Sequence, residues 1–227
     1  MAERPAPARS RAGGPAPTKA APGAVPPRAR LSAAPPDLGG LLPKVVALGE
    51  KYGYDAAHGQ QVARLCEALF AALAPVHGLQ EAWAVPLQHA ALLHDVGYFL
   101  GAQGHHRHSA YLIRHDALLV DYPPEWRRLV ALLARNHRRR VRRGPRSWGR
   151  SRRRVAVALA ALLRLADGLD YGHDGAARLA AVRVRAGRLQ IGVAGLRLRT
   201  VEPVLRKKAL LFARTFSLPV VFTAAEH

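Results

Sequence analysis

One stretch of the sequence combines an apolar helix pattern with side chains that could bind a cation. In the helix expected from about residue 83 to 98, Leu87, Ala90, His94 and Tyr98 recur at helical spacing, so the imidazole of His94 continues an otherwise apolar stripe. Asp95 follows directly. A histidine beside a carboxylate can offer nitrogen and oxygen ligands to one cation. Because such pairs are common, the interpretation depends on further ligands from other segments.

Two other predicted helices also place a ligand-type residue on an apolar face. Asp55 is the expected N-cap of a helix from about residue 56 to 74, and His58 lies in the first turn of that helix. Asp167 continues the apolar stripe of the helix expected over 155–169. A buried carboxylate needs a cation, a metal or a proton to offset its desolvation. With the His-Asp pair, these residues predict a metal centre between helices. Mixed imidazole and carboxylate ligands suit Mn, Mg, Fe, Co, Ni or Zn.

More histidines follow the His-Asp pair. The glycine-bounded loop expected over 101–109 holds His105, His106 and His108, which suits either a solvated loop or a metal-binding one. Closeness to the His-Asp pair favours metal binding. In the helix expected over 125–137, His137 follows the apolar residue Leu133 by four positions and so lies on the same face.

The composition predicts a mainly α-helical protein of 227 residues. Hydrophobic residues make up 49% of the chain and aromatic residues only 6%, and small apolar side chains favour closely packed helices. The single cysteine, Cys66, excludes an intrachain disulfide and favours a reducing, cytoplasmic setting. The sequence has no secretory h-region at its start and no apolar run of the roughly 18 residues that a membrane span needs.

Three regions are expected along the chain. Residues 1–40 are expected to form a disordered, basic tail rich in proline and alanine, because nine of the seventeen prolines lie within the first 36 residues and few large apolar groups accompany them. Residues 41–175 form a helical bundle that contains a flexible Arg-rich loop over 138–154. Residues 176–227 form a small β-β-α-β appendage, in which a hairpin turns around Gly187.

The net charge of +20 predicts attraction to polyanions. Half of it lies in residues 138–154, which hold ten arginines and no acidic residue. Nucleic acid is one partner that such a loop would bind, with Trp148 as a stacking group. A solvated loop in an arginine-rich proteome is the competing and favoured interpretation.

The order His, His-Asp, Asp resembles the signature of the HD superfamily of metal-dependent phosphohydrolases. Five motifs resemble, more narrowly, the C-terminal HD domain of the exopolyphosphatase and guanosine-pentaphosphatase (Ppx/GppA) family. They are His58 to Phe70, Ala90 to Tyr98, Gly104 to Ile113, Asn136 to Arg139 and Ala161 to Asp170. The resemblance implies an HD-type helical bundle from about residue 41 to 222, and homodimers.

The resemblance also implies roles for individual residues. A first metal would be held by His58, His94, Asp95 and Asp167. Asp95 would bridge to a second metal held by His105 and His137. The metals would polarise a phosphoryl oxygen and activate water for attack. Substrate phosphate would be neutralised by Arg107, Arg114 or Arg138.

The sequence departs from the family pattern in three places. Tyr98 stands where many HD hydrolases have a lysine, Asn136 stands where two-metal relatives often have a histidine, and residues 1–40 do not contain the sugar-kinase-like catalytic half. We therefore expect a phosphohydrolase acting on a nucleotide, a (p)ppGpp-like or a polyphosphate-like substrate. The alternative is a non-catalytic module that binds nucleotide, polyphosphate or a partner protein.

Overall fold

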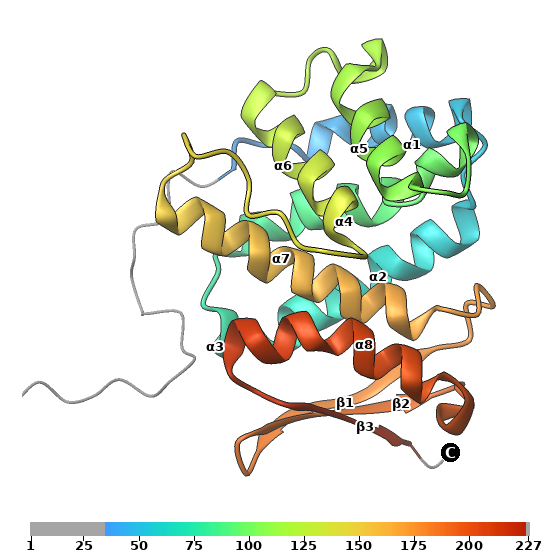
Figure 1. Cartoon of the computed structure of the whole chain (residues 1–227), viewed down its shortest axis with the longest axis vertical. Helices are drawn as coiled ribbons and strands as arrows, with labels where there is room; N and C mark the ends of the chain where they lie inside the picture. Colours follow the sequence, from blue (N-terminus) through green and yellow to red (C-terminus); the bar gives the residue numbers. More distant parts are fainter. Residues whose placement is uncertain (1–34, 226–227) are drawn as a thin grey trace, which may run out of the picture.

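The computed structural model describes residues 35–225, so residues 1–34 of the expected basic tail lie outside the described part. Within it, eight α-helices and a small three-stranded sheet form the protein, which confirms the predicted mainly helical class (Figure 1). The helices are α1 (Leu42–Lys51), α2 (Ala56–Ala72), α3 (Ala74–His77), α4 (Ala84–Leu93), α5 (His105–His115), α6 (Pro124–Asn136), α7 (Arg150–Leu169) and α8 (Leu198–Phe216). Short 3-10 helices cover Gly39–Leu41, Glu81–Trp83, Val96–Leu100 and Ala117–Leu119.

The sheet lies at the C-terminal end of the chain, as predicted. Strand β1 (Arg178–Arg185) pairs antiparallel with β2 (Arg188–Ala194), and β2 pairs parallel with β3 (Val220–Ala224). The parallel pair requires a crossover, which α8 supplies. Figure 1 shows α8 between the sheet and α7. The buried face of α8 consists of residues at helical spacing, namely Leu205, Ala209, Phe212 and Phe216.

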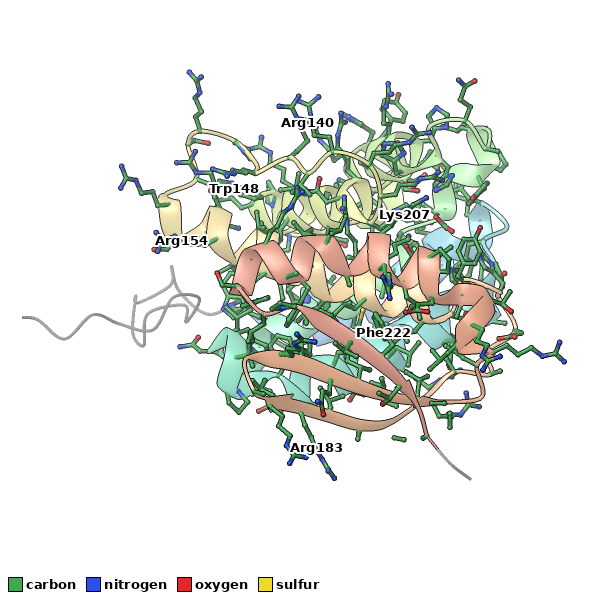
Figure 2. All side chains as sticks on the ribbon, turned by 60° about the horizontal axis from the view of Figure 1, so that its bottom comes forward. Arg140, Trp148, Arg154, Arg183, Lys207 and Phe222 are labelled. Atoms are coloured by element: carbon green, nitrogen blue, oxygen red, sulfur yellow. The ribbon has the colours of Figure 1, made fainter. Side chains whose placement is uncertain are left out.

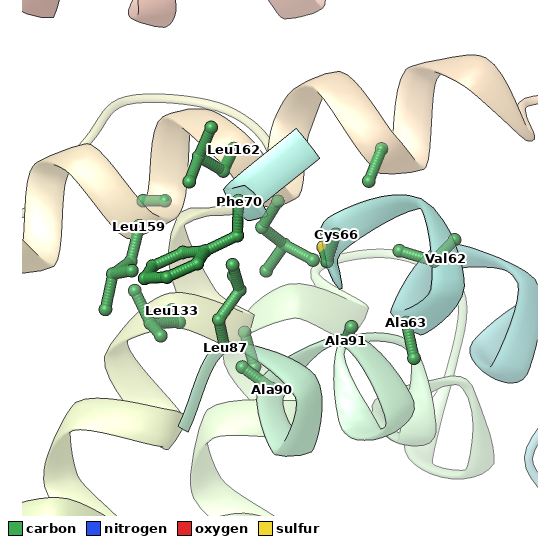
Figure 3. Close-up of a cluster of buried hydrophobic side chains, with 14 of the residues drawn as sticks. Val62, Ala63, Cys66, Phe70, Leu87, Ala90, Ala91, Leu133, Leu159 and Leu162 are labelled. Atoms are coloured by element: carbon green, nitrogen blue, oxygen red, sulfur yellow. The ribbon is translucent and has the colours of Figure 1, made fainter. Parts of the chain in front are cut away.

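The core lies among α2, α4, α6 and α7. Figure 3 shows Phe70, Leu87 and Leu162 within this cluster of buried side chains. Cys66 packs among them, and burial raises the pKa of its thiol, so it acts as a small apolar group. At the start of α2, the Asp55 carboxylate accepts a hydrogen bond from the backbone N–H of His58, which confirms Asp55 as the N-cap.

The helix that carries the His-Asp pair is shorter than predicted. It was expected to reach Tyr98, but α4 ends at Leu93 and the chain continues as the 3-10 helix Val96–Leu100. A Cβ at Gly97 would lie 2.2 Å from the carbonyl oxygen of His105, so the backbones of this 3-10 helix and α5 are in direct contact. Tyr98 is 49% exposed and does not continue the buried stripe.

Two further boundaries differ from the prediction. The expected loop over 101–109 already becomes α5 at His105, after Gly104 in the left-handed conformation. The helix expected from Val155 begins at Arg150. The extra first turn is held in place by Arg152, which is buried. Its guanidinium lies 4.7 Å from the ring centroid of Trp126 and 4.9 Å from that of Trp148.

The loop between α6 and α7 is anchored to the body of the protein. Trp148 is only 4% exposed and packs where Gly144 leaves room, so its expected role as an exposed stacking group is wrong. The Asn136 side chain donates to the carbonyl oxygen of Arg142 and accepts from its backbone N–H, at 2.7 and 2.9 Å. Among residues 35–225, no helix has both the length and the apolar character needed to cross a membrane.

A buried histidine outside the candidate site should make the fold sensitive to acid. His89 is fully buried, and burial lowers its pKa to about 4. Below pH 6.5 the unfolded chain therefore binds a proton that the folded chain excludes, and stability falls as the pH drops toward 4. Between pH 7 and pH 5 this histidine should account for a loss of about 2 kcal/mol in the free energy of unfolding.

Urea unfolding at the two pH values measures this contribution. His89→Asn should lose about 2 kcal/mol less than the wild type on acidification. His115→Asn, which changes an exposed histidine, is the control. An equal acid loss in His89→Asn and the wild type would contradict the expectation.

Candidate metal centre

The structure brings together six ligand-type side chains that are scattered through the sequence. All lie at or near helix ends, and all except Asp95 are buried. They are His58 in the first turn of α2, His94 and Asp95 directly after α4, His105 at the start of α5, His137 directly after α6 and Asp167 in the last turn of α7.

Two separate groups of these side chains could each hold a metal ion. In the first group, the Nε2 atoms of His58 and His94 are 3.2 Å apart, and Oδ1 of Asp167 is 3.9 Å from Nε2 of His94. In the second group, Oδ1 of Asp95 lies 3.2 Å from Nε2 of His105 and 3.4 Å from Nε2 of His137. The ligand atoms within each group lie within 4.8 Å of one another.

Asp95 belongs to the second group and also faces the first. While its Oδ1 faces the second group, its Oδ2 is 3.5 Å from Nε2 of His94 and 3.9 Å from Nε2 of His58. One carboxylate thus presents an oxygen to each side, which is the geometry of a bridging ligand. The third group that could hold a metal consists of His58, Asp95 and His173, which belongs to the turn after α7.

Hydrogen bonds to Nδ1 determine which histidine nitrogen is free to bind a metal. His94, His105 and His137 each place Nδ1 at 2.6–3.1 Å from the carbonyl oxygen three residues earlier. His58 places Nδ1 at 2.7 Å from Oδ2 of Asp170. Because these oxygens can only accept, each Nδ1 carries the proton, and each neutral imidazole presents an Nε2 lone pair. The ends of α4 and α6 supply two of these acceptors, since the last carbonyl groups of a helix lack intrahelical partners.

The resulting arrangement of lone pairs fits a cation. Nε2 of His58 faces Nε2 of His94 at 3.2 Å, and Nε2 of His105 faces Nε2 of His137 at the same distance. Two lone pairs cannot hydrogen-bond to each other. Oδ1 of Asp95 is also buried without a hydrogen-bond partner in the described residues. A divalent cation bound by these nitrogen and oxygen lone pairs would satisfy all of these atoms.

The surroundings of His58, His137 and Asp95 favour the protonation states that metal binding requires. Burial lowers the pKa of His137 well below its ordinary value, and burial together with His94 lowers that of His58. Burial by itself would raise the pKa of Asp95, but the surrounding histidines hold it well below its usual range. Neutral imidazoles and an ionised carboxylate are the forms that bind metal ions.

The three arginines predicted to bind phosphate occupy different positions. Nη1 of Arg138 lies 3.3 Å from Nε2 of His105, so this guanidinium is at the centre. Arg107 and Arg114 are exposed on α5 and make no side-chain hydrogen bond or ion pair within residues 35–225. Tyr98 stacks on the ring of His105, with centroids 3.9 Å apart, and thus covers one side of the centre.

The other two histidines of the predicted metal-binding loop, His106 and His108, also lie on α5. His106 is buried, and burial lowers its pKa to about 4, while its Nδ1 has no partner in the described residues. His108 directs Nδ1 to the carbonyl oxygen of Gly101 at 3.3 Å.

The sequence interpretation missed three residues at the centre. His173 stacks on His58 with ring centroids 3.6 Å apart, Asp170 binds Nδ1 of His58, and Lys208 of α8 forms an ion pair with Asp167. Asp170 was detectable, since it lies one turn after Asp167 in the same motif. Lys208 carries no sequence signal, because it belongs to a distant segment.

Asp170→Asn should weaken metal binding about 10- to 100-fold, which is the usual effect of changing a residue that orients a metal ligand. The Asn amide can donate to Nδ1 of His58, which would place the proton on Nε2 and remove the ligand lone pair. Calorimetric titration with Mn²⁺ measures the effect, and Asp174→Asn, which changes an exposed carboxylate in the turn after α7, is the control. Equal affinities for Asp170→Asn and the wild type would contradict this role for Asp170.

The fold and the site together define an HD-type helical domain with a candidate metal centre between its helices. Comparison with protein families agrees with this class. The family model described as Ppx/GppA phosphatase, domain III, matches residues 43–213. The chain therefore belongs to the Ppx/GppA phosphatase family and contains its third, HD-like domain.

Proposed function

We propose that this protein is a metal-dependent phosphohydrolase that acts on a nucleotide, a (p)ppGpp-like or a polyphosphate-like substrate. One observation carries the proposal: four Nε2 lone pairs and both oxygens of Asp95 converge on one centre, without hydrogen bonds between them. We assign His58, His94, Asp95 and Asp167 to one metal, and Asp95, His105 and His137 to a second. Bound divalent ions would polarise the phosphoryl oxygen and acidify the attacking water.

The protein's own residues would bind and orient the substrate. Arg138 stands beside His105, where its planar guanidinium could bind two phosphoryl oxygens. The basic surface would increase the local concentration of phosphate compounds, because the chain carries a net charge of +20. Tyr98 would limit access to the His105 side of the centre.

Metal analysis combined with a phosphatase screen tests this proposal. The purified protein should contain, or bind on addition, one or two divalent ions per chain. With Mn²⁺ or Mg²⁺ it should release phosphate from at least one nucleotide or short polyphosphate, and a chelator should stop the release. A protein that binds no divalent ion at neutral pH would refute the proposal.

A non-catalytic binding module is the second candidate. It is favoured by Tyr98, which places an aromatic ring on His105 where many HD hydrolases have a lysine. Such a module would bind metal and phosphate compounds without turnover. Nucleotide binding together with no phosphate release in the full screen would support this function over hydrolysis.

The Arg-rich loop supports a third candidate, nucleic-acid binding. Figure 2 labels Arg140 and Arg154 on this part of the surface. The exposed arginines of the loop and the start of α7 are Arg139, Arg140, Arg142, Arg143, Arg146, Arg150 and Arg154. Because Trp148 is buried, binding would rest on phosphate contacts, with a strong dependence on salt. An affinity and salt slope unchanged by replacing these arginines with glutamine would exclude this function.

A further inference from the structure

Lys208 brings a positive charge from the C-terminal segment into the candidate metal centre. It is the last of three consecutive basic residues on α8, and the three side chains take different directions. Arg206 pairs with Glu202 one turn earlier on the surface, and Lys207 is exposed. Lys208 alone of the three forms an ion pair with Asp167, and its Nζ lies 3.5 Å from the carbonyl oxygen of His137.

The close packing of α7 against α8 determines the direction of the Lys208 side chain. A Cβ at Gly168 would lie 3.1 Å from both Cβ and Cγ of Lys208, so glycine at this position leaves room for the lysine stem. Leu205 and Ala209 on either side of Lys208 are buried, which determines how α8 is rotated about its axis. The packing of the two helices therefore determines where the Lys208 side chain lies.

The ammonium group lies beside the centre without blocking it. It binds Oδ2 of Asp167, while Oδ1 of the same carboxylate faces Nε2 of His94 at 3.9 Å. An ammonium group has three donors. In the described residues only Asp167 and His137 supply acceptors to Lys208, so one N–H remains free. The Lys208 side chain is 18% exposed, so part of it is accessible to a ligand from solvent.

We propose that Lys208 is a substrate-positioning residue whose free N–H binds a phosphoryl oxygen at the metal centre. This inference rests on the proposed function and deepens it. The 3-10 helix after the His-Asp pair offers Tyr98 and no cation, whereas α8 delivers a cation at Asp167. The α8 segment would thus be a part of the site, together with the Arg138 guanidinium near His105.

Binding of inorganic phosphate to the Mn²⁺-loaded full chain tests this role. Three variants are compared with the wild type: Lys208→Met, Lys208→Arg and the neighbouring control Lys207→Met. Mn²⁺ affinity is measured first by calorimetry, and phosphate affinity is measured second. Lys208→Met should bind phosphate about 10- to 100-fold more weakly, as expected for the loss of a hydrogen bond to a charged group.

The other measurements separate substrate positioning from a structural role. Lys208→Arg should recover most of the phosphate affinity, Lys207→Met should match the wild type, and Mn²⁺ affinity should not fall in any variant. With a hydrolysed substrate, Lys208→Met should raise KM by a similar factor.

Two results would overturn the inference while the proposed function stands. One is a Lys208→Met variant that binds phosphate as the wild type does. The other is a loss of Mn²⁺ affinity in that variant, which would make Lys208 a support of Asp167. If the wild type itself bound neither Mn²⁺ nor phosphate, the proposed function would fail, and this inference with it.

Discussion

Asp95→Asn is expected to lower metal affinity by about 100-fold or more and to abolish phosphate release. The carboxylate presents one oxygen to His58 and His94 and the other to His105 and His137, so the substitution affects both groups at once. Residues that only orient ligands already contribute roughly 10- to 100-fold to metal affinity, and a bridging ligand should exceed them. The amide keeps the shape of the side chain but removes its charge and one acceptor.

Metal content by mass spectrometry and calorimetric titration with Mn²⁺ measure this effect. Asp121→Asn is a matched control, because Asp121 is exposed and, among residues 35–225, pairs only with Lys44 on the surface. The control should bind metal and release phosphate as the wild type does. Phosphate release by Asp95→Asn at the rate of the control would show that the reaction does not use this centre.

Gly97→Ala is expected to destabilise the fold by about 3 kcal/mol or more, the upper part of the range for inserting an atom into packed structure. The added Cβ would lie 2.2 Å from the carbonyl oxygen of His105 and 2.2 Å from the backbone nitrogen of Ser109. Both are backbone atoms of α5, so no side-chain rotation can relieve the overlap. The backbone N–H of Gly97 also donates to the Ser109 hydroxyl at 2.9 Å, which would be strained as well.

The substitution should also separate the two halves of the centre. Gly97 lies two residues after Asp95, and α5 begins with His105, so a displaced α5 would move this ligand away from the carboxylate. Urea unfolding and Mn²⁺ stoichiometry measure the two effects. Gly40→Ala, where the added Cβ meets no atom within 4 Å, is the control and should remain stable. Full stability of Gly97→Ala would mean that α5 does not pack this closely.

The sequence by itself determined the features that depend on local physics. Helical periodicity indicated that His94 and Asp167 end apolar faces, and the N-cap preference placed Asp55 at the start of α2. Alternating residues around Gly187 predicted the hairpin that β1 and β2 form. These signals lie within a few residues of one another, because capping, turns and amphipathic faces are short-range properties.

Only the tertiary structure decided how these pieces meet. The end of α4 at Leu93 follows from the backbone contact between Gly97 and α5, and the burial of Trp148 follows from its packing against Arg152. No local pattern encodes such contacts, because they depend on how separate helices pack. Lys208 shows this most clearly: it lies 41 residues after Asp167 and reaches it because glycine at position 168 lets α7 and α8 approach.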